Sequence, residues 1–155
     1  MMLVVSDTSP LTALLQIGRA DLLPILFDSV VIPPAVEKEL LRFHSALPTY
    51  LLVRSARRRE VVEQLERQLD DGEAEAIALA EESHADYLLI DEKRGRSLAE
   101  SRGVQVVGLL GVLLMAKKSG QLPVLGEIIA ELESRAGFFV SSEVRRTILA
   151  AAGEM

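Results

Sequence analysis

The chain has 155 residues and a net charge of −6, which fits one domain over residues 1–155 and argues against coating nucleic acid through overall charge. Hydrophobic residues make up 49%, enough for a core, yet no run of about 18 uncharged residues indicates a membrane span, and no signal peptide is visible. The absence of cysteine excludes disulfides and thiolate metal sites and is compatible with a cytoplasmic location.

The chain opens with a short apolar strand that ends on a carboxylate. Leu3–Val5 is a continuous apolar run, typical of a strand covered on both faces, and Asp7 follows it closely. Ser9 is a candidate N-cap for the next helix, and Pro10 suits the first turn of that helix. The following predicted elements are a short helix over 22–27, a buried strand over 29–32 and a helix that opens at Pro33-Pro34.

The rest of the chain alternates helical periodicity with short apolar runs. The least regular part is 43–54, where Tyr50–Val53 is a candidate extra strand. The other predicted elements are helices over 60–69 and 73–82, a strand over 87–90, a helix over 94–101, a strand over 104–107, helices over 109–118 and 124–135, an edge strand over 138–140 and a last helix from 141. This alternation predicts an α/β fold with three layers, α/β/α, around a central, mainly parallel sheet of four to five strands.

Acidic residues occur where ligands gather in such a fold. Asp7 and Asp91 each follow a strand, and the carboxyl ends of parallel strands share one edge of the sheet. Carboxylate oxygens suit Mg²⁺, and a cation removes the repulsion between crowded carboxylates. Roles as helix caps or turn residues remain open at this point, because acids also favour helix N-termini. Two helices supply further acids, Glu37 or Glu39 in the first and Glu73 or Glu75 in the second.

The segments around these acids resemble those of a known family. They are Val5–Leu11, Ile32–Leu40, Asp71–Ala80 and Leu88–Arg96, followed by the run from Gly103 to Gly120. In this order they resemble a PIN domain, the fold of the VapC-type toxin ribonucleases. More narrowly, the chain is similar to a group of small prokaryotic PIN-like proteins of uncharacterised function. The similarity covers nearly the whole chain.

The resemblance implies a quartet of metal-binding acids. Thr8 or Ser9 matches the small hydroxyl residue that follows the first Asp and helps to orient a ligand. Many PIN domains have Asp at the third position, where this chain has Glu. The matching positions are Asp7 for the first, Glu39 (alternatively Glu37) for the second, Glu73 (alternatively Glu75) for the third, and Asp91 for the fourth, with Glu92 beside it as a fifth.

Together these features predict a nuclease that depends on Mg²⁺ or Mn²⁺ and hydrolyses phosphodiester bonds in single-stranded RNA. The resemblance implies in-line attack by water that leaves a 5′-phosphate and a 3′-hydroxyl. Lys93, Arg94 and Arg96 follow Asp91 and are candidates for holding the RNA backbone. The resemblance also suggests a toxin with an antitoxin protein as partner, and a homodimer. The competing hypothesis is a catalytically inactive PIN-like module that binds RNA or a protein.

Overall fold

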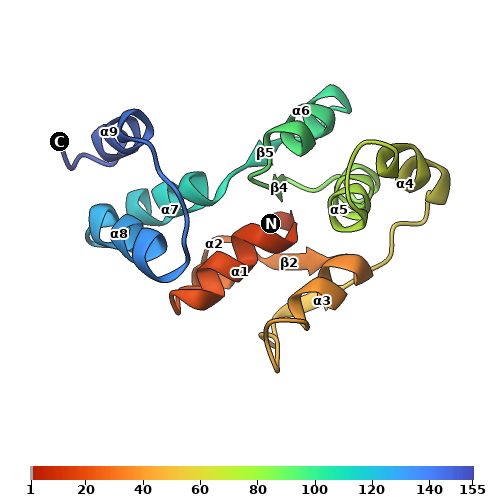
Figure 1. Cartoon of the computed structure of the whole chain (residues 1–155), viewed down its shortest axis with the longest axis horizontal. Coiled ribbons are helices and arrows are strands. Elements are labelled where there is room, and N and C mark those ends of the chain that lie inside the picture. The colour runs from red at the N-terminus through yellow and green to blue at the C-terminus, as the bar shows by residue number, and fades with distance from the viewer. Residues whose placement is uncertain (1) are drawn as a thin grey trace.

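The computed structural model describes residues 2–155. A parallel sheet lies at the centre of the fold (Figure 1). All strand pairs are parallel, and the order is β3-β2-β1-β4-β5. The predicted central parallel sheet is therefore confirmed, with Met1 outside the described residues. The strands are β1 (Leu3–Ser6), β2 (Ser29–Ile32), β3 (Leu51–Val53), β4 (Tyr87–Leu89) and β5 (Val106–Val107).

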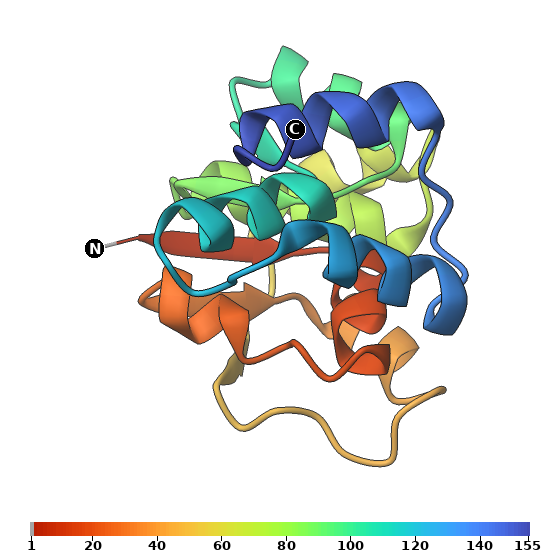
Figure 2. The same cartoon turned by 90° about the vertical axis from the view of Figure 1, so that its left-hand side faces the viewer.

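Helices cover both faces of the sheet, which confirms the predicted three-layer α/β/α arrangement (Figures 1 and 2). One face carries α1 (Thr8–Gln16), α2 (Leu22–Leu26), α7 (Leu109–Lys118) and α8 (Leu125–Arg135). The other carries α4 (Arg59–Glu66), α5 (Asp71–Glu82) and α6 (Lys93–Ser101). The helix α3 (Pro34–Leu40) contacts both α1 and α5, and α9 (Ser142–Ala151) contacts α7.

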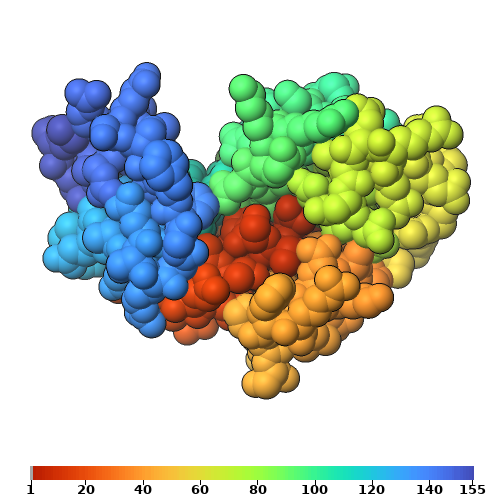
Figure 3. Space-filling model, viewed as in Figure 1, coloured from red at the N-terminus to blue at the C-terminus, as the bar shows by residue number. Residues whose placement is uncertain are grey.

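These helices are short, and the longest, α5, has 12 residues. None of those within residues 2–155 is long and apolar enough to cross a membrane. In the space-filling view, the C-terminal segment and α6 stand apart, with the N-terminal segment at the bottom of the hollow between them (Figure 3).

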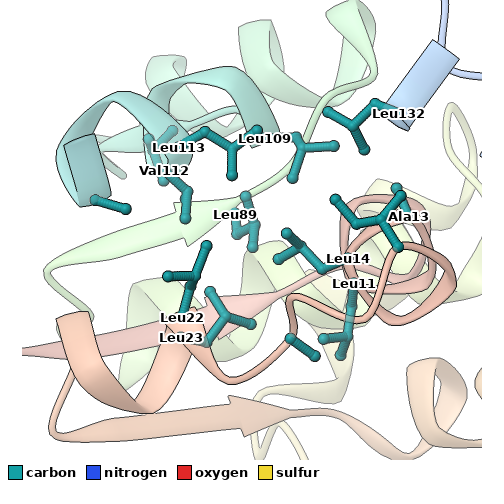
Figure 4. Close-up of a cluster of buried hydrophobic side chains, with 14 of the residues drawn as sticks. Leu11, Ala13, Leu14, Leu22, Leu23, Leu89, Leu109, Val112, Leu113 and Leu132 are labelled. Carbon is teal, nitrogen blue, oxygen red and sulfur yellow. The ribbon is translucent and has the colours of Figure 1, made fainter. Parts of the chain in front are cut away.

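Neighbouring strand residues point to opposite faces of the sheet, so each strand contributes to two cores. Val4 and Leu89 pack with leucines of α1, α2 and α7, as Figure 4 shows for Leu89. Val5 and Leu88 pack on the opposite side with α4, α5 and α6. The continuous apolar runs in the sequence reflect this burial on both faces.

The predicted edge strand over 138–140 is wrong, and the segment instead closes the C-terminal end of α8. Gly137 adopts a φ of +63°, which turns the chain, and the Phe138 N–H donates to the Leu132 carbonyl at 3.0 Å. Val140 is buried against the helices, whereas 85% of Phe139 is exposed. The apolar character of the segment therefore serves packing against the helical layer rather than pairing with a strand.

Candidate active site

The strand order places a topological switch between β1 and β4. From β1 the chain moves outward to β2 and β3, and it then returns to β4 on the other side of β1. Asp7 follows β1, Asp91 follows β4, and the Asp7 N–H donates to the Leu89 carbonyl at 2.9 Å. The two aspartates therefore follow adjacent strand ends at the edge where open parallel sheets bind ligands.

Asp7 occupies the N-cap position of α1, where Ser9 was the candidate. Ser9 lies inside the first turn and is exposed. The Asp7 side chain accepts no capping hydrogen bond from the described part of the helix. A capping carboxylate normally accepts the N–H of the second or third residue of the helix, whereas the N–H that acts on the Asp7 carboxyl is that of Thr8, the first residue of α1.

The surroundings of Asp7 disfavour its charge. The residue is 5% exposed, and burial raises the pKa of its carboxyl to about 7. The Thr8 N–H opposes this shift. Three nearby carboxylates raise the pKa further, and they belong to Asp70, Glu39 and Asp91. A buried acid among other acids is a position that a cation would stabilise.

Asp91 is held at one oxygen and free at the other. Its Oδ1 accepts the Leu109 N–H at the start of α7 at 2.9 Å. Its Oδ2 is buried and has no hydrogen-bond partner within residues 2–155. Burial raises the pKa of the Asp91 carboxyl, while the Leu109 N–H and the Arg96 charge oppose the shift. An unpartnered buried carboxylate oxygen is uncommon and has the chemistry of a ligand atom.

Glu73 lies in the first turn of α5 and shares a capping box with Asp70. The Glu73 N–H donates to Asp70 Oδ1 at 2.8 Å, and the Asp70 N–H donates to Glu73 Oε1 at 3.4 Å. Burial raises the pKa of the Glu73 carboxyl to about 8, with further contributions from Asp70 and Asp7. Asp70 was not among the predicted site residues, although the Asp-x-x-Glu spacing of a capping box was visible in the sequence.

Of the two candidates in α3, Glu39 is the one whose charge acts on Asp7. Its carboxylate also lies against Gly72, where a Cβ would clash with it. Glu39, Asp70 and Arg42 line a hollow of about 330 Å³. The structure therefore places Glu39, rather than Glu37, beside the acids of β1 and α5.

Three glycines on separate elements lie close to three of the four carboxylates. Each stands where an added Cβ would meet a carboxylate oxygen. Glycine is suited to such close approaches because it has no side chain. At Gly72 of α5 the nearest atom is a Glu39 carboxylate oxygen. At Gly95 of α6 a Cβ would meet Ile90 Cδ1 at 2.7 Å and Glu73 at 3.3 Å, and at Gly108, the N-cap of α7, it would meet Arg96 Nη1 at 2.6 Å and Asp91 at 2.7 Å.

The donor chemistry of this cluster fits a hard divalent cation such as Mg²⁺ or Mn²⁺. The side chains offer only oxygen ligands, two have pKa values raised to about 7 and 8, and Asp91 Oδ2 lacks a partner in the described chain. As these side chains stand, no three acidic or histidine groups in residues 2–155 form a closed ligand set. A cation would therefore have to draw the carboxylates together.

The alternates Glu75 and Glu92 each stabilise a helix. Glu75 accepts the Ala35 N–H at 3.2 Å and pairs with Arg59 at 3.5 Å, so it connects α5 to α3 and α4. Glu92 is the N-cap of α6 and accepts the Gly95 N–H at 2.7 Å. That hydrogen bond is the main reason that the pKa of Glu92 is lowered.

The predicted phosphate contacts fall in two places. Lys93 and Arg94 are exposed at the start of α6, and Arg94 donates to Gln68 at 3.2 Å. Arg96 is half-buried, donates to the Ile90 carbonyl at 3.4 Å and acts on the charge of Asp91. Arg96 thus belongs to the acidic cluster itself, whereas Lys93 and Arg94 face solvent.

The predicted hydroxyl contacts also differ from each other. Thr8 is half-buried, and its Oγ1 has no partner in the part of the chain that the structure describes. Ser9 is exposed. Both line a groove between α1 and the segment that follows α8.

The sequence was compared with curated proteins and with models of protein families. No curated protein matches the chain. A family model described as a PIN domain matches residues 3–154. Because this match spans nearly the whole chain, the chain belongs to the PIN domain family.

Proposed function

We propose that this protein is an endoribonuclease that depends on Mg²⁺ or Mn²⁺ and hydrolyses phosphodiester bonds in RNA. PIN domains are generally nucleases and typically use divalent metal ions. The observation that carries the proposal is the position of Asp7 and Asp91 on adjacent strand ends at the topological switch. Glu39 and Glu73 support the proposal, because both interact with Asp7. The charge of Glu39 raises the pKa of Asp7, and the charge of Asp7 raises the pKa of the buried Glu73.

In this proposal Asp7, Glu39, Glu73 and Asp91 hold the cation. When bound, the cation lowers the pKa of a water molecule and neutralises charge that builds up on the scissile phosphate. The backbone contacts of Asp7 and Asp91 fix their positions relative to each other, and one carboxylate oxygen orients the attacking water. Lys93 and Arg94 hold the RNA backbone through its phosphates. The products carry a 5′-phosphate and a 3′-hydroxyl.

The toxin role, an antitoxin partner and a homodimer enter the proposal through the family resemblance alone. The competing function, a PIN-like module that binds RNA or a protein without cleaving it, differs from the proposal in one measurable respect. Such a module has no cleavage activity with any divalent cation.

The test is cleavage of an end-labelled single-stranded RNA in chelator, in millimolar Mg²⁺ and in millimolar Mn²⁺. We expect no cleavage in chelator, cleavage with either cation, and 5′-phosphate on the downstream product. RNA binding without cleavage under all three conditions would favour the inactive module. Cleavage that continues in chelator would contradict metal dependence.

Changing Arg94 to Ala is expected to weaken binding of all RNA sequences alike. It should also reduce the slope of the logarithm of the binding constant against the logarithm of the salt concentration by about one. Arg94 is exposed in the first turn of α6, three residues after Asp91. Contacts of such a cation with RNA phosphates carry no sequence information. Lys118→Ala is the matched control, because Lys118 is an exposed cation at the far end of α7. The measurement is the dissociation constant of several RNAs over a range of salt. An altered sequence preference with an unchanged salt slope would contradict a phosphate contact.

A further inference from the structure

A groove of about 390 Å³ lies between α1 and the turn that follows α8. Phe43, which follows α3, and Phe138, which follows α8, both line it, and Thr8 and Thr12 line it from α1. None of the residues that line the groove is charged. Its volume is in the range of pockets that bind small molecules.

The lining combines apolar rings with hydrogen-bonding groups that have no partner. Phe43 is 74% exposed, so its ring is available to a ligand. The hydroxyls of Thr8 and Thr12 are buried and make no hydrogen bond to the residues that the structure describes. Buried hydroxyls are normally satisfied, so two unsatisfied ones behind the lining of the same groove are candidates for hydrogen bonds with a ligand.

Two residues that line the groove are close in sequence to predicted metal-binding acids. Thr8 directly follows Asp7, and Phe43 comes four residues after Glu39. In the space-filling view, the N-terminal segment that contains α1 lies at the bottom of the surface hollow, with the C-terminal segment as one wall (Figure 3). Thr8 therefore connects the groove to the acidic cluster along the chain, because it lies between Asp7 and the rest of α1.

We propose that this groove binds one unstacked nucleobase of the RNA, next to the phosphate that is cleaved. A base is flat, uncharged and edged with donors and acceptors, which matches a lining of phenyl rings, methyl groups and free hydroxyls. Phe43 stacks on the base, while the hydroxyls of Thr8 and Thr12 form hydrogen bonds with the donors and acceptors on the edge of the base. This inference rests on the proposed function for the identity of the ligand, but its residues are separate from the metal-binding carboxylates.

The test compares Phe43→Ala with Phe139→Ala in RNA binding measured in chelator, where the RNA stays intact. Loss of a base-stacking ring is expected to weaken binding roughly 5- to 150-fold. Phe139 is 85% exposed and does not line the groove, so its variant is expected to bind like wild type. RNA with an abasic site at the contacted position should bind both variants equally. Equal binding of intact RNA by both variants would overturn the proposal.

A second variant separates ligand binding from folding. Thr12→Val keeps the shape of the side chain and removes an unsatisfied buried hydroxyl, so the free protein should melt at the same or a higher temperature. The same change should weaken RNA binding, because the base loses a hydrogen bond. Higher stability with unchanged RNA binding would count against contact between Thr12 and a base.

The outcomes also distinguish this inference from the nuclease proposal. Free nucleosides, added while the methyl NMR signals of Thr8, Thr12 and Ala136 are followed, test the groove without cleavage. Shifts of these signals in a protein that cleaves no RNA would support the groove and contradict the nuclease. Cleavage of RNA that is unaffected by Phe43→Ala, with no shift by nucleosides, would support the nuclease and overturn the groove.

Discussion

Replacing Asp7 with Asn is expected to lower RNA cleavage at least about 100-fold, because several kcal/mol of transition-state stabilisation depend on the bound cation. The same change should leave the metal-free protein as stable as wild type, or more stable. Asn is nearly isosteric, and it removes a charge that burial and three nearby acids disfavour. The packing of β1 does not depend on that charge, because Val4 and Val5 are fully buried and apolar.

Addition of metal should reverse this order of stability. A ligand that binds only the folded state adds about 2.7 kcal/mol at 100 times its dissociation constant. For a chain of this length, that is a rise in Tm of roughly 5–10 °C. Wild type should show this rise in Mg²⁺ or Mn²⁺, and Asp7→Asn should lose most of it. The measurement is thermal melting of both proteins in chelator and in millimolar metal, alongside RNA cleavage.

Asp86→Asn is the matched control, because Asp86 precedes β4 at the opposite edge of the sheet and accepts the Leu3 N–H at 2.6 Å. It should keep both the metal-dependent rise in Tm and the cleavage activity. Strong destabilisation of Asp7→Asn in chelator would show that Asp7 is a structural residue. An equal rise in Tm for Asp7→Asn and wild type would show that Asp7 is not a ligand.

The second prediction is that Glu73→Gln flattens the pH dependence of stability in chelator. The pKa of Glu73 is raised from 4.5 to about 8 on folding, so the folded state keeps a proton that the unfolded state releases above pH 4.5. Unfolding then releases protons, and the contribution of Glu73 to stability falls as pH rises from about 4.5 to about 8. Asp7 acts in the same direction, from 3.8 to about 7.

The expected difference between Glu73→Gln and wild type grows by about 1–2 kcal/mol between pH 5 and pH 8, after a discount for screening by solvent. Gln keeps an oxygen that accepts the Asp70 N–H, so the capping box survives. The measurement is urea unfolding of both proteins at several pH values. Glu63→Gln on the exposed surface of α4 is the control and should follow wild type. Parallel curves for Glu73→Gln and wild type would contradict a protonated Glu73 in the metal-free fold.

Much of the fold could be predicted because local sequence patterns carry it. Apolar runs such as Leu3–Val5 and Tyr87–Ile90 mark strands that are covered on both faces, whatever their neighbours in the sheet are. Asp7 and Asp91 can be recognised as acids at strand ends because each closely follows one of these apolar runs. The segment 138–140 shows the limit of this reasoning, because Val140 is buried against helices and an apolar run does not reveal whether its partner is a strand or a helix.

The sequence by itself determined the layers and the parallel sheet, because these follow from the alternation of strands and helices along the chain. It also offered Asp7, Asp91 and two pairs of glutamates as candidates, among which the family resemblance favours Glu39 and Glu73. Only the tertiary structure decided that β1 and β4 are neighbours, that Asp70 joins the cluster and that Arg96 turns inward to Asp91. It also decided that Phe43 and Phe138 meet across one groove. Apart from Arg96 and Asp91, which are five residues apart, these relations join residues that are far apart in the chain. The packing of the whole core, rather than any local preference, brings them together.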